Sequence, residues 1–287
     1  MADASEPSED GRMPFFEHIR ELRSRLRNAA IAFIVAFVSC WFFAERIYVW
    51  LRVPIDNAWF NNADTLGSTA ILTYSKPTEP FWVYMSVAMW AGIFVASPLI
   101  FYQLWRFIAP GLYKKERRIG IAFAFFSAIF FVTGALFCYH FVLENLYTFL
   151  LSYSDASLKP TIMMGEYFDL TKDMMLAFGA VFELPLLIYF LAMVGLVTHR
   201  GLWKFNRWFI VLAFIIGAIL TPSPDVISQI FMAVPMIALY NMSILAAYFV
   251  TRSKEKKKHA QRMRERDAEA RLRAKQRRDE DEGEDED

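Results

Sequence analysis

Residues 174–197 read MMLAFGAVFELPLLIYFLAMVGLV, an apolar run interrupted by one carboxylate, Glu183, and one proline, Pro185. A helix needs about 20 residues to cross the hydrocarbon core of a bilayer, so this run is long enough to span it. A charged carboxylate at that depth costs at least about 2.5 to 3.5 kcal/mol, which makes Glu183 a candidate functional residue. The alternative is a protonated acid bonded to the carbonyl of Val181, which Pro185 leaves without its usual donor.

Five further apolar runs are read along the chain, at residues 26–43, 81–105, 119–142, 208–220 and 226–250. They lack the alternation of barrel strands, and backbone groups in lipid must be satisfied within their own segment. The sequence therefore predicts an all-α membrane protein with six transmembrane helices. The run at 208–220 is short for an average bilayer and requires a thinner membrane or longer neighbours.

The composition excludes several classes of protein. Hydrophobic residues make up 56% of the 287, and the charged residues gather at the two ends and in short connections. A soluble enzyme, a coiled coil and a disordered scaffold are therefore excluded. The net charge of +1 is a cancellation between a basic and an acidic block, so its value gives no sign of attraction to nucleic acid. No nucleic-acid partner is expected.

The distribution of Lys and Arg predicts the orientation. Five lie in residues 1–28, five in 106–118, three in 195–207 and thirteen in 251–287, against five on the alternate segments. Basic residues favour the cytoplasmic side, so both termini are predicted to be cytoplasmic. The long connections at about 44–80 and 144–173 then lie outside. The first ten residues carry no base, so they lack the basic start of a cleavable signal peptide.

Motifs for catalysis and metal binding are missing from the sequence. The two cysteines, Cys40 and Cys138, fall near the same predicted depth; a disulfide is conceivable, and free thiols are favoured. The four histidines are scattered, and the sequence lacks H-E-x-x-H, G-x-S-x-G and the P-loop motif. No enzymatic activity and no cofactor are expected.

Polar residues near the ends of the apolar runs are candidate contacts. Residues 14–28 form an amphipathic helix in which Glu21 and Arg25 have the spacing of an ion pair, although Glu21 could instead present its carboxylate to a cationic ligand. Glu116 stands among four cations, whose repulsion it relieves on the simplest interpretation. Asp225 is placed to cap the last helix, and Thr221 and Gln229 are suited to hydrogen bonds between helices.

Four motifs together resemble the TatC family. They are H-x-x-E-L-R-x-R-L at residues 18–26, F-I-A-P-x-L-Y-x-x-E-R-R at 107–118, F-x-x-P at 182–185 and T-P-x-P-D-x-x-S-Q at 221–229. The resemblance covers about residues 14–252, between an acidic N-terminus at 1–13 and a charged cytoplasmic tail at 253–287. It implies a glove-like bundle of six membrane helices whose hollow exposes Glu183.

The resemblance also implies a function. TatC is the core receptor of the twin-arginine translocase, which moves folded proteins across the cytoplasmic membrane using the proton-motive force. Its positions for the paired arginines of signal peptides fall on Glu21 and Glu116, with Phe107 and Arg23 in the same motifs. Pro54 and Pro80 match the outer cap, where Asp225 also lies near a turn.

The partners implied by the resemblance are single-span TatA and TatB proteins, twin-arginine signal peptides and the lipid bilayer, in a multi-copy complex. Thr221 and Gln229 would lie near the docking edge for the single-span proteins. The main alternative is a proton-coupled secondary transporter that uses Glu183 as its relay, and it predicts paired halves with broken helices. The sequence has prolines within two spans, Pro98 and Pro235, but no clear internal repeat.

Overall fold

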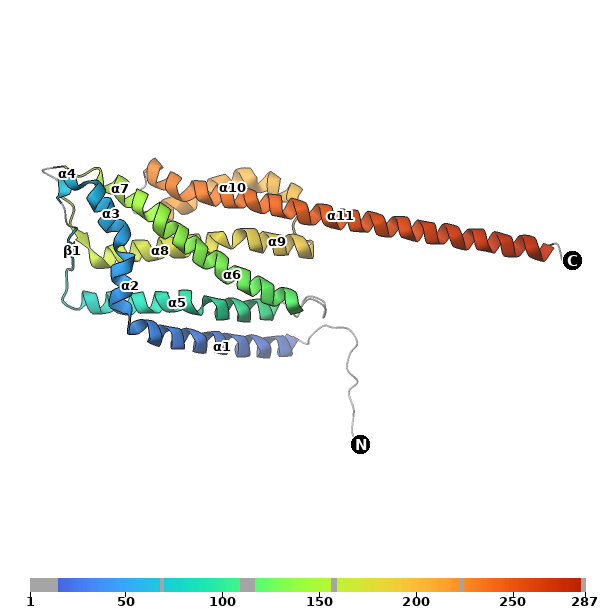
Figure 1. Cartoon of the computed structure of the whole chain (residues 1–287), viewed down its shortest axis with the longest axis horizontal. Helices are drawn as coiled ribbons and strands as arrows, with labels where there is room; N and C mark the ends of the chain where they lie inside the picture. The colour runs from blue at the N-terminus through green and yellow to red at the C-terminus, as the bar shows by residue number, and fades with distance from the viewer. Residues whose placement is uncertain (1–14, 68–69, 109–116, 156–158, 222–224, 285–287) are drawn as a thin grey trace, which may run out of the picture.

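The chain forms a bundle of long helices with one pair of two-residue strands (Figure 1). The computed structural model describes residues 15–67, 70–108, 117–155, 159–221 and 225–284. In chain order the elements are α1 (Phe15–Trp41), α2 (Ala44–Leu51), α3 (Val53–Asn61), α4 (Ala63–Leu66), β1 (Leu72–Thr73), α5 (Glu79–Ile108), α6 (Arg117–Phe137), a π-helical turn η3 (Cys138–Leu143), α7 (Glu144–Leu151), β2 (Ile162–Met163), α8 (Met164–Phe182), α9 (Leu184–Val194), α10 (His199–Leu220) and α11 (Val226–Glu284).

The predicted six-span architecture is confirmed. Within the described segments, five stretches are long and apolar enough to cross a membrane: Glu79–Ile108, Gly120–Leu151, Met164–Val194, His199–Leu220 and Val226–Arg252. The sixth is the first helix taken together with α2 and α3, which bend away from it by 82°. The first helix needs this addition because its early turns carry several arginines.

Two ends of the bundle are distinguished below. The cap end carries α2, α3, α4 and the paired strands β1 and β2, which lie across the tops of the long helices (Figure 1). The tail end carries the start of α1, the end of α5 and the start of α6, and α11 leaves the bundle there. Beyond the bundle, α11 continues as a single straight helix (Figure 1).

Small residues set how closely the long helices approach. The bundle packs α1 on α5, α5 on α6, α6 on α8, and α11 on both α9 and α10. A Cβ added to Gly134 on α6 would lie 2.6 Å from the carbonyl oxygen of Phe178 on α8. A Cβ on Gly179 of α8 would lie 2.8 Å from the Phe131 ring of α6. Glycine is therefore needed on both sides of this crossing.

Tyrosine hydroxyls fasten the cap to the bundle. The hydroxyl of Tyr139, in the π-helical turn, donates to the carbonyl of Trp50 at 2.5 Å, and the hydroxyl of Tyr167 on α8 donates to the carbonyl of Leu51 at 2.6 Å. Both carbonyls belong to the last two residues of α2, so the two tyrosines hold the end of that helix against the bundle. The Trp50 and Tyr139 rings also stack with centroids 4.2 Å apart.

Two boundaries differ from the sequence prediction. The connection predicted at 144–173 is shorter, because α7 and α8 extend the third and fourth spans and bury Tyr147, Tyr167 and Phe168 beneath the cap. Lys172 consequently lies within the fourth span. The helix around the short 208–220 run begins earlier, at His199, where Thr198 caps it by accepting from the Gly201 N–H.

Candidate functional site

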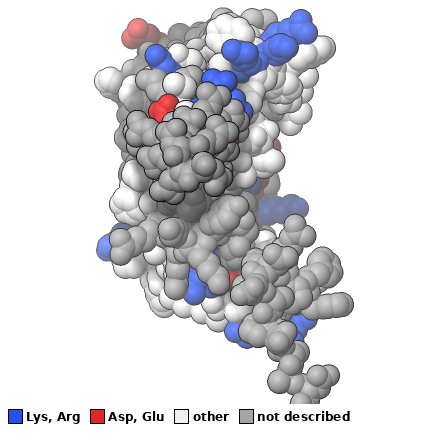
Figure 2. All heavy atoms as spheres, turned by 90° about the vertical axis from the view of Figure 1, so that its right-hand side faces the viewer, with Lys and Arg blue, Asp and Glu red and all other residues white. Residues whose placement is uncertain are grey.

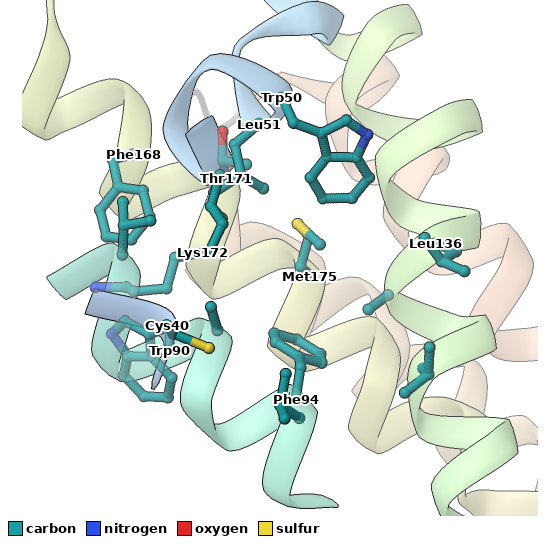
Figure 3. A pocket seen from close by; sticks show the side chains of 16 residues that line it. Cys40, Trp50, Leu51, Trp90, Phe94, Leu136, Phe168, Thr171, Lys172 and Met175 are labelled. Carbon is teal, nitrogen blue, oxygen red and sulfur yellow. The ribbon is translucent and has the colours of Figure 1, made fainter. Parts of the chain in front are cut away.

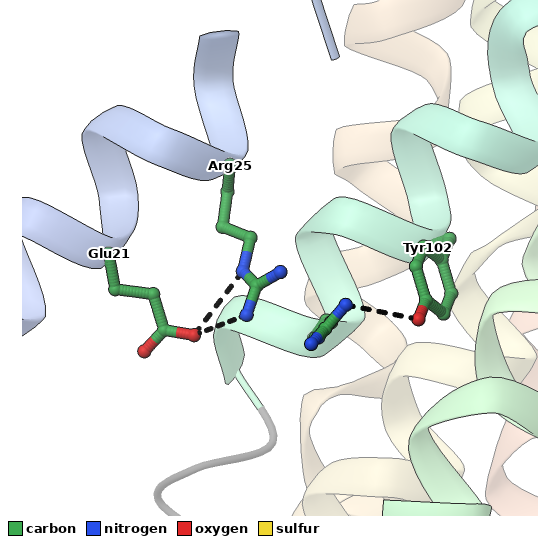
Figure 4. A network of polar contacts seen from close by, with 4 residues as sticks. Glu21, Arg25 and Tyr102 are labelled. Atoms are coloured by element: carbon green, nitrogen blue, oxygen red, sulfur yellow. Dashed lines mark hydrogen bonds and ion pairs between the residues drawn. The ribbon is translucent and has the colours of Figure 1, made fainter. Parts of the chain in front are cut away.

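Glu21 and Arg25 form an ion pair on α1 at the tail end (Figure 4). Arg25 Nη2 donates to Glu21 Oε1 at 2.7 Å, and Arg25 Nε approaches the same oxygen at 3.3 Å. The side chains are only 15% and 17% exposed, so water screens the pair less than an ordinary surface pair. The pairing that the i,i+4 spacing predicts is therefore present, on a covered part of the tail end.

The second carboxylate oxygen of Glu21 makes this pair more than a surface ion pair. Oε2 is buried, and it has no hydrogen-bond partner among the described residues. A carboxylate oxygen accepts strong, short bonds from a guanidinium, and leaving it buried without a donor costs free energy. Glu21 thus has one buried acceptor oxygen that the described residues leave unused.

The end of α5 lies beside this ion pair. Figure 4 shows Tyr102 on the helix next to Glu21 and Arg25, and α1 packs along α5. Arg106 donates to the Tyr102 hydroxyl at 3.3 Å, and its guanidinium lies 5.8 Å from the ring centroid. Phe107, one residue further along the helix, is half-buried. The tail end of α5 therefore offers aromatic faces and a second cation close to Glu21.

The other two charged residues predicted for this site are Arg23 and Glu116. Arg23 is exposed on α1, and the described residues give it no ion pair. Glu116 lies outside the described residues. Figure 2 looks onto the tail end, where Lys and Arg side chains predominate over Asp and Glu among the described residues.

Glu183 lies at the junction between α8 and α9. It closes α8 and precedes Pro185, which occupies the first turn of α9. The carboxyl is half-buried and lies beside the Ser127 hydroxyl of α6. Its Oε1 is buried and has no hydrogen-bond partner in the described part of the chain. Glu183 is therefore partly satisfied within the protein and keeps one acceptor for another group.

Ser127 connects Glu183 to the tail end of α5. Its hydroxyl oxygen accepts from the Trp105 indole N–H at 2.8 Å, and both residues are buried. The relay of Trp105, Ser127 and Glu183 thus connects the tail end of α5 with the junction between α8 and α9. Ser127 was not among the predicted site residues. Its only signal in the sequence was a hydroxyl within the apolar run at 119–142.

The polar residues predicted near the junction between α10 and α11 make contacts close to the ends of these helices. Asp225 caps α11 by accepting from the Ser228 N–H at 2.7 Å. The Thr221 hydroxyl donates to the Gly217 carbonyl of its own helix at 2.8 Å and is buried. Gln229 is half-buried one turn into α11, where its backbone would lie 3.4 Å from a Cβ on Gly217. The two helices therefore approach closely beside Thr221 and Gln229.

The remaining predicted residues lie at helix starts or in the core. Pro54 is buried in the first turn of α3, and Pro80 is half-buried in the first turn of α5, where a proline costs no backbone hydrogen bond. Cys40 and Cys138 are both free and buried. Across the described residues, no three His, Cys, Asp or Glu side chains gather in a group that could hold a metal ion.

Comparisons with known proteins agree with this arrangement. The sequence model of the family described as "Sec-independent protein translocase protein (TatC)" matches residues 17–235. The TatC protein of Koribacter versatilis is 42% identical over 239 residues, which cover 83% of this chain and 86% of that protein. The TatC protein of Aquifex aeolicus is 37% identical over 246 residues, which cover 85% of this chain and 98% of that protein.

A solved structure, titled "Crystal Structure of Twin Arginine Translocase Receptor- TatC", is 36% identical in sequence. It superposes with a TM-score of 0.70 and covers 82% of this chain and 99% of its own. A second crystal structure of the receptor, in the detergent DDM, gives a TM-score of 0.71 at the same identity and covers 80% and 99%. The six-span bundle, the family match over most of its length and these relatives lead to one conclusion: the chain belongs to the TatC family of Sec-independent protein translocase components.

Proposed function

We propose that this protein is the receptor subunit of a twin-arginine translocase, and that it binds the paired arginines of signal peptides at its tail end. The observation that carries this proposal is the Glu21 carboxylate, which has one oxygen paired with Arg25 and a second, buried oxygen without a partner among the described residues. A solved relative titled as the twin-arginine translocase receptor supports the same assignment.

The chemistry of the site favours arginine over lysine. A guanidinium presents a rigid fork of donors that can bridge the two oxygens of a carboxylate, whereas an ammonium is a point charge. An incoming arginine would bond to Glu21 Oε2 and share Oε1 with Arg25. Glu116 would receive the second arginine, and Phe107 and Arg23 would border the bound peptide. Tyr102 holds the Arg106 guanidinium 5.8 Å from its ring centroid and so adds an aromatic ring beside the proposed site.

The membrane-embedded residues would serve the assembly of the translocase. Glu183 keeps a buried acceptor, and α10 exposes many apolar side chains, including Trp203, Trp208 and Ile219. A polar group on the single transmembrane helix of a TatA- or TatB-type partner could satisfy such an acceptor in lipid. We place the docking edge at Thr221 and Gln229, and transport in a multi-copy complex driven by the proton-motive force.

The membrane and the orientation follow from the charge distribution. We place the protein in the cytoplasmic membrane with the tail end, both termini and the charged segment from residue 253 in the cytoplasm. The excess of Lys and Arg at the tail end supports this orientation. The acidic residues 1–13, the six-span domain 14–252 and the tail 253–287 would then be three functional parts.

Binding of a fluorescently labelled signal peptide to the detergent-purified protein tests the receptor assignment. Peptides with Arg-Arg and Lys-Lys are compared on wild type, Glu21→Ala and Glu116→Ala. Each loss of a charge-assisted hydrogen bond should weaken binding by roughly 10-fold to 100-fold, since such bonds contribute about 1.5 to 3 kcal/mol.

The matched control is Glu45→Ala, which removes an exposed carboxylate at the cap end. It should bind the Arg-Arg peptide as wild type does, and all variants should unfold at similar temperatures. Equal binding of both peptides by wild type and by both glutamate variants would contradict the proposal.

A further inference from the structure

A second candidate binding site lies below the cap, away from the tail end. An apolar pocket of about 310 Å³ opens there between α1, α2, α5, α6 and α8 (Figure 3). Its volume falls at the lower end of the roughly 300 to 1,000 Å³ that is usual for ligand sites. Trp50, Val95 and Leu136 line it and are 43%, 63% and 40% exposed, so the pocket opens to the surroundings of the bundle.

The wall of the pocket is mostly apolar and carries one cation. Lys172, in the third turn of α8, is the charged residue among those that line it. Figure 3 shows Lys172 between Phe168 and Trp90 at one side of the pocket. The ammonium lies 5.6 Å from the Trp90 ring and 6.0 Å from the Phe168 ring. An ionisable residue in a membrane span is rare and marks a functional site by default.

The charges around Lys172 do not balance. Its ammonium bonds to Asp169 Oδ1 at 2.7 Å and approaches Asp173 Oδ1 at 3.5 Å, so one cation serves two carboxylates. These aspartates are 65% and 54% exposed, whereas the Lys172 side chain is 16% exposed. The rim of the pocket therefore presents a covered cation next to two open carboxylates. A ligand that carries both an anion and a cation would complement this rim.

The surrounding bilayer determines which kind of group can fill the apolar part of the pocket. Water is excluded there, and an empty apolar cavity forfeits the dispersion contacts of the groups that line it. The cavity opens at a height where a tryptophan and a lysine lie close together, as such residues do at the boundary between lipid tails and headgroups. An acyl chain is the apolar group that is always available at this position.

We propose that this pocket binds one phospholipid whose headgroup carries a primary ammonium group, with an acyl chain beside Phe94 and Met175. The phosphate bonds to Lys172, and the ammonium bonds to Asp169 and Asp173. A glycerol headgroup supplies the phosphate but no cation for the aspartates. A choline headgroup supplies a cation without N–H donors, so it cannot form those hydrogen bonds.

Native mass spectrometry of the intact purified protein with added lipids tests the proposal. The probes are phosphatidylethanolamine, phosphatidylglycerol and phosphatidylcholine with identical acyl chains. Wild type should retain one ethanolamine lipid about tenfold more tightly than either of the others. Lys172→Met, which keeps an apolar stem without the charge, should lose this preference.

Two further variants separate the pocket from the headgroup site. Ala91→Phe puts a ring into the cavity and should reduce retention of the ethanolamine lipid about tenfold. The matched control is Lys159→Met, an exposed lysine at the same end of the bundle, which should retain the lipid as wild type does. Equal retention of the three lipids, or undiminished retention by Lys172→Met, would overturn the proposal.

A photo-crosslinking residue at Val95 distinguishes a lipid from a peptide as the occupant. In bilayers that contain the ethanolamine lipid, cross-linking to lipid with and without an added signal peptide supports the proposal. Cross-linking to the apolar segment of the peptide, with loss of the lipid product, would assign the pocket to the peptide and contradict the lipid site. Because the site for the paired arginines lies at the other end, failure here leaves the receptor assignment unchanged.

Discussion

Ser127 on α6 lies between the Trp105 indole and the Glu183 carboxyl. Its hydroxyl oxygen accepts from the Trp105 indole N–H at 2.8 Å, and the carboxyl of Glu183 lies beside it. In Ser127→Ala the buried Trp105 indole N–H loses its acceptor, and the half-buried Glu183 carboxyl loses a neighbouring hydroxyl. The free energy of unfolding should fall by roughly 1 to 3 kcal/mol, measured by thermal or denaturant unfolding in detergent.

Ser39→Ala is the matched control for this substitution. The Ser39 hydroxyl donates to the Val35 carbonyl of its own helix in an exposed position, so its loss leaves no buried group unpaired. This control should change stability by no more than about 0.5 kcal/mol. Equal stability of the two variants would show that the relay contributes nothing to the fold.

The sequence identified Glu183 but could not identify its partner. A carboxylate inside an apolar run is conspicuous because its insertion is unfavourable. Ser127 is not conspicuous, since a serine hydroxyl can satisfy itself on the carbonyl four residues earlier in its own helix. Only the packing of α6 against α8 distinguishes a serine that meets Glu183 from one that bonds to its own backbone. The ion pair of Glu21 was visible for the opposite reason, because both partners lie on one helix.

At the scale of the helices, Gly134 determines whether that packing can form. A Cβ at this position would lie 2.6 Å from the Phe178 carbonyl and 2.7 Å from the Phe182 ring, so Gly134→Ala forces α6 away from α8. Overpacking of this kind typically costs about 1 to 3 kcal/mol. We expect a lower unfolding temperature in detergent.

Gly201→Ala provides the comparison for Gly134→Ala. Its added Cβ would meet only the Thr198 hydroxyl at 3.4 Å, and alanine is the better helix former. This variant should be as stable as wild type or slightly more so. If Gly134→Ala also unfolds at the wild-type temperature, the close crossing of α6 and α8 is not required for the fold.

The positions of the spans could be predicted from hydropathy, whereas the cap could not. Most residues of each apolar run are helical, since lipid leaves the backbone no other way to satisfy its polar groups. The helices α2, α3 and α7 mix polar and apolar residues, and tertiary contacts such as the one between Tyr167 and Leu51 hold them. These contacts join residues far apart in the chain, so no local sequence pattern predicts them. For the same reason, Lys172 was predicted to lie in the connection at 144–173, whereas the structure places it in α8.

At the scale of the whole molecule, the tail of α11 is separate from the bundle. Residues 260–270 are all exposed, and Figure 1 shows the helix continuing alone. A chain that ends after Arg252 should therefore unfold at the same temperature as the full chain and bind the Arg-Arg peptide equally well. A drop of more than a few degrees, or weaker binding, would show that the tail contacts the bundle or the peptide.

The orientation of the molecule follows from charges at its two ends rather than from any single residue. Thirteen Lys and Arg lie in residues 251–287 and ten more in the segments 1–28 and 106–118, whereas the alternate segments hold five in all. Since basic segments favour the cytoplasmic side, we expect the cap to face outward. In a variant without Cys40 and Cys138, Asn61→Cys at the cap end should react with a membrane-impermeant maleimide on intact cells. Gln261→Cys in the tail should react only after the cells are broken, and the reverse pattern would invert the topology and place Glu21 on the wrong side to meet a signal peptide.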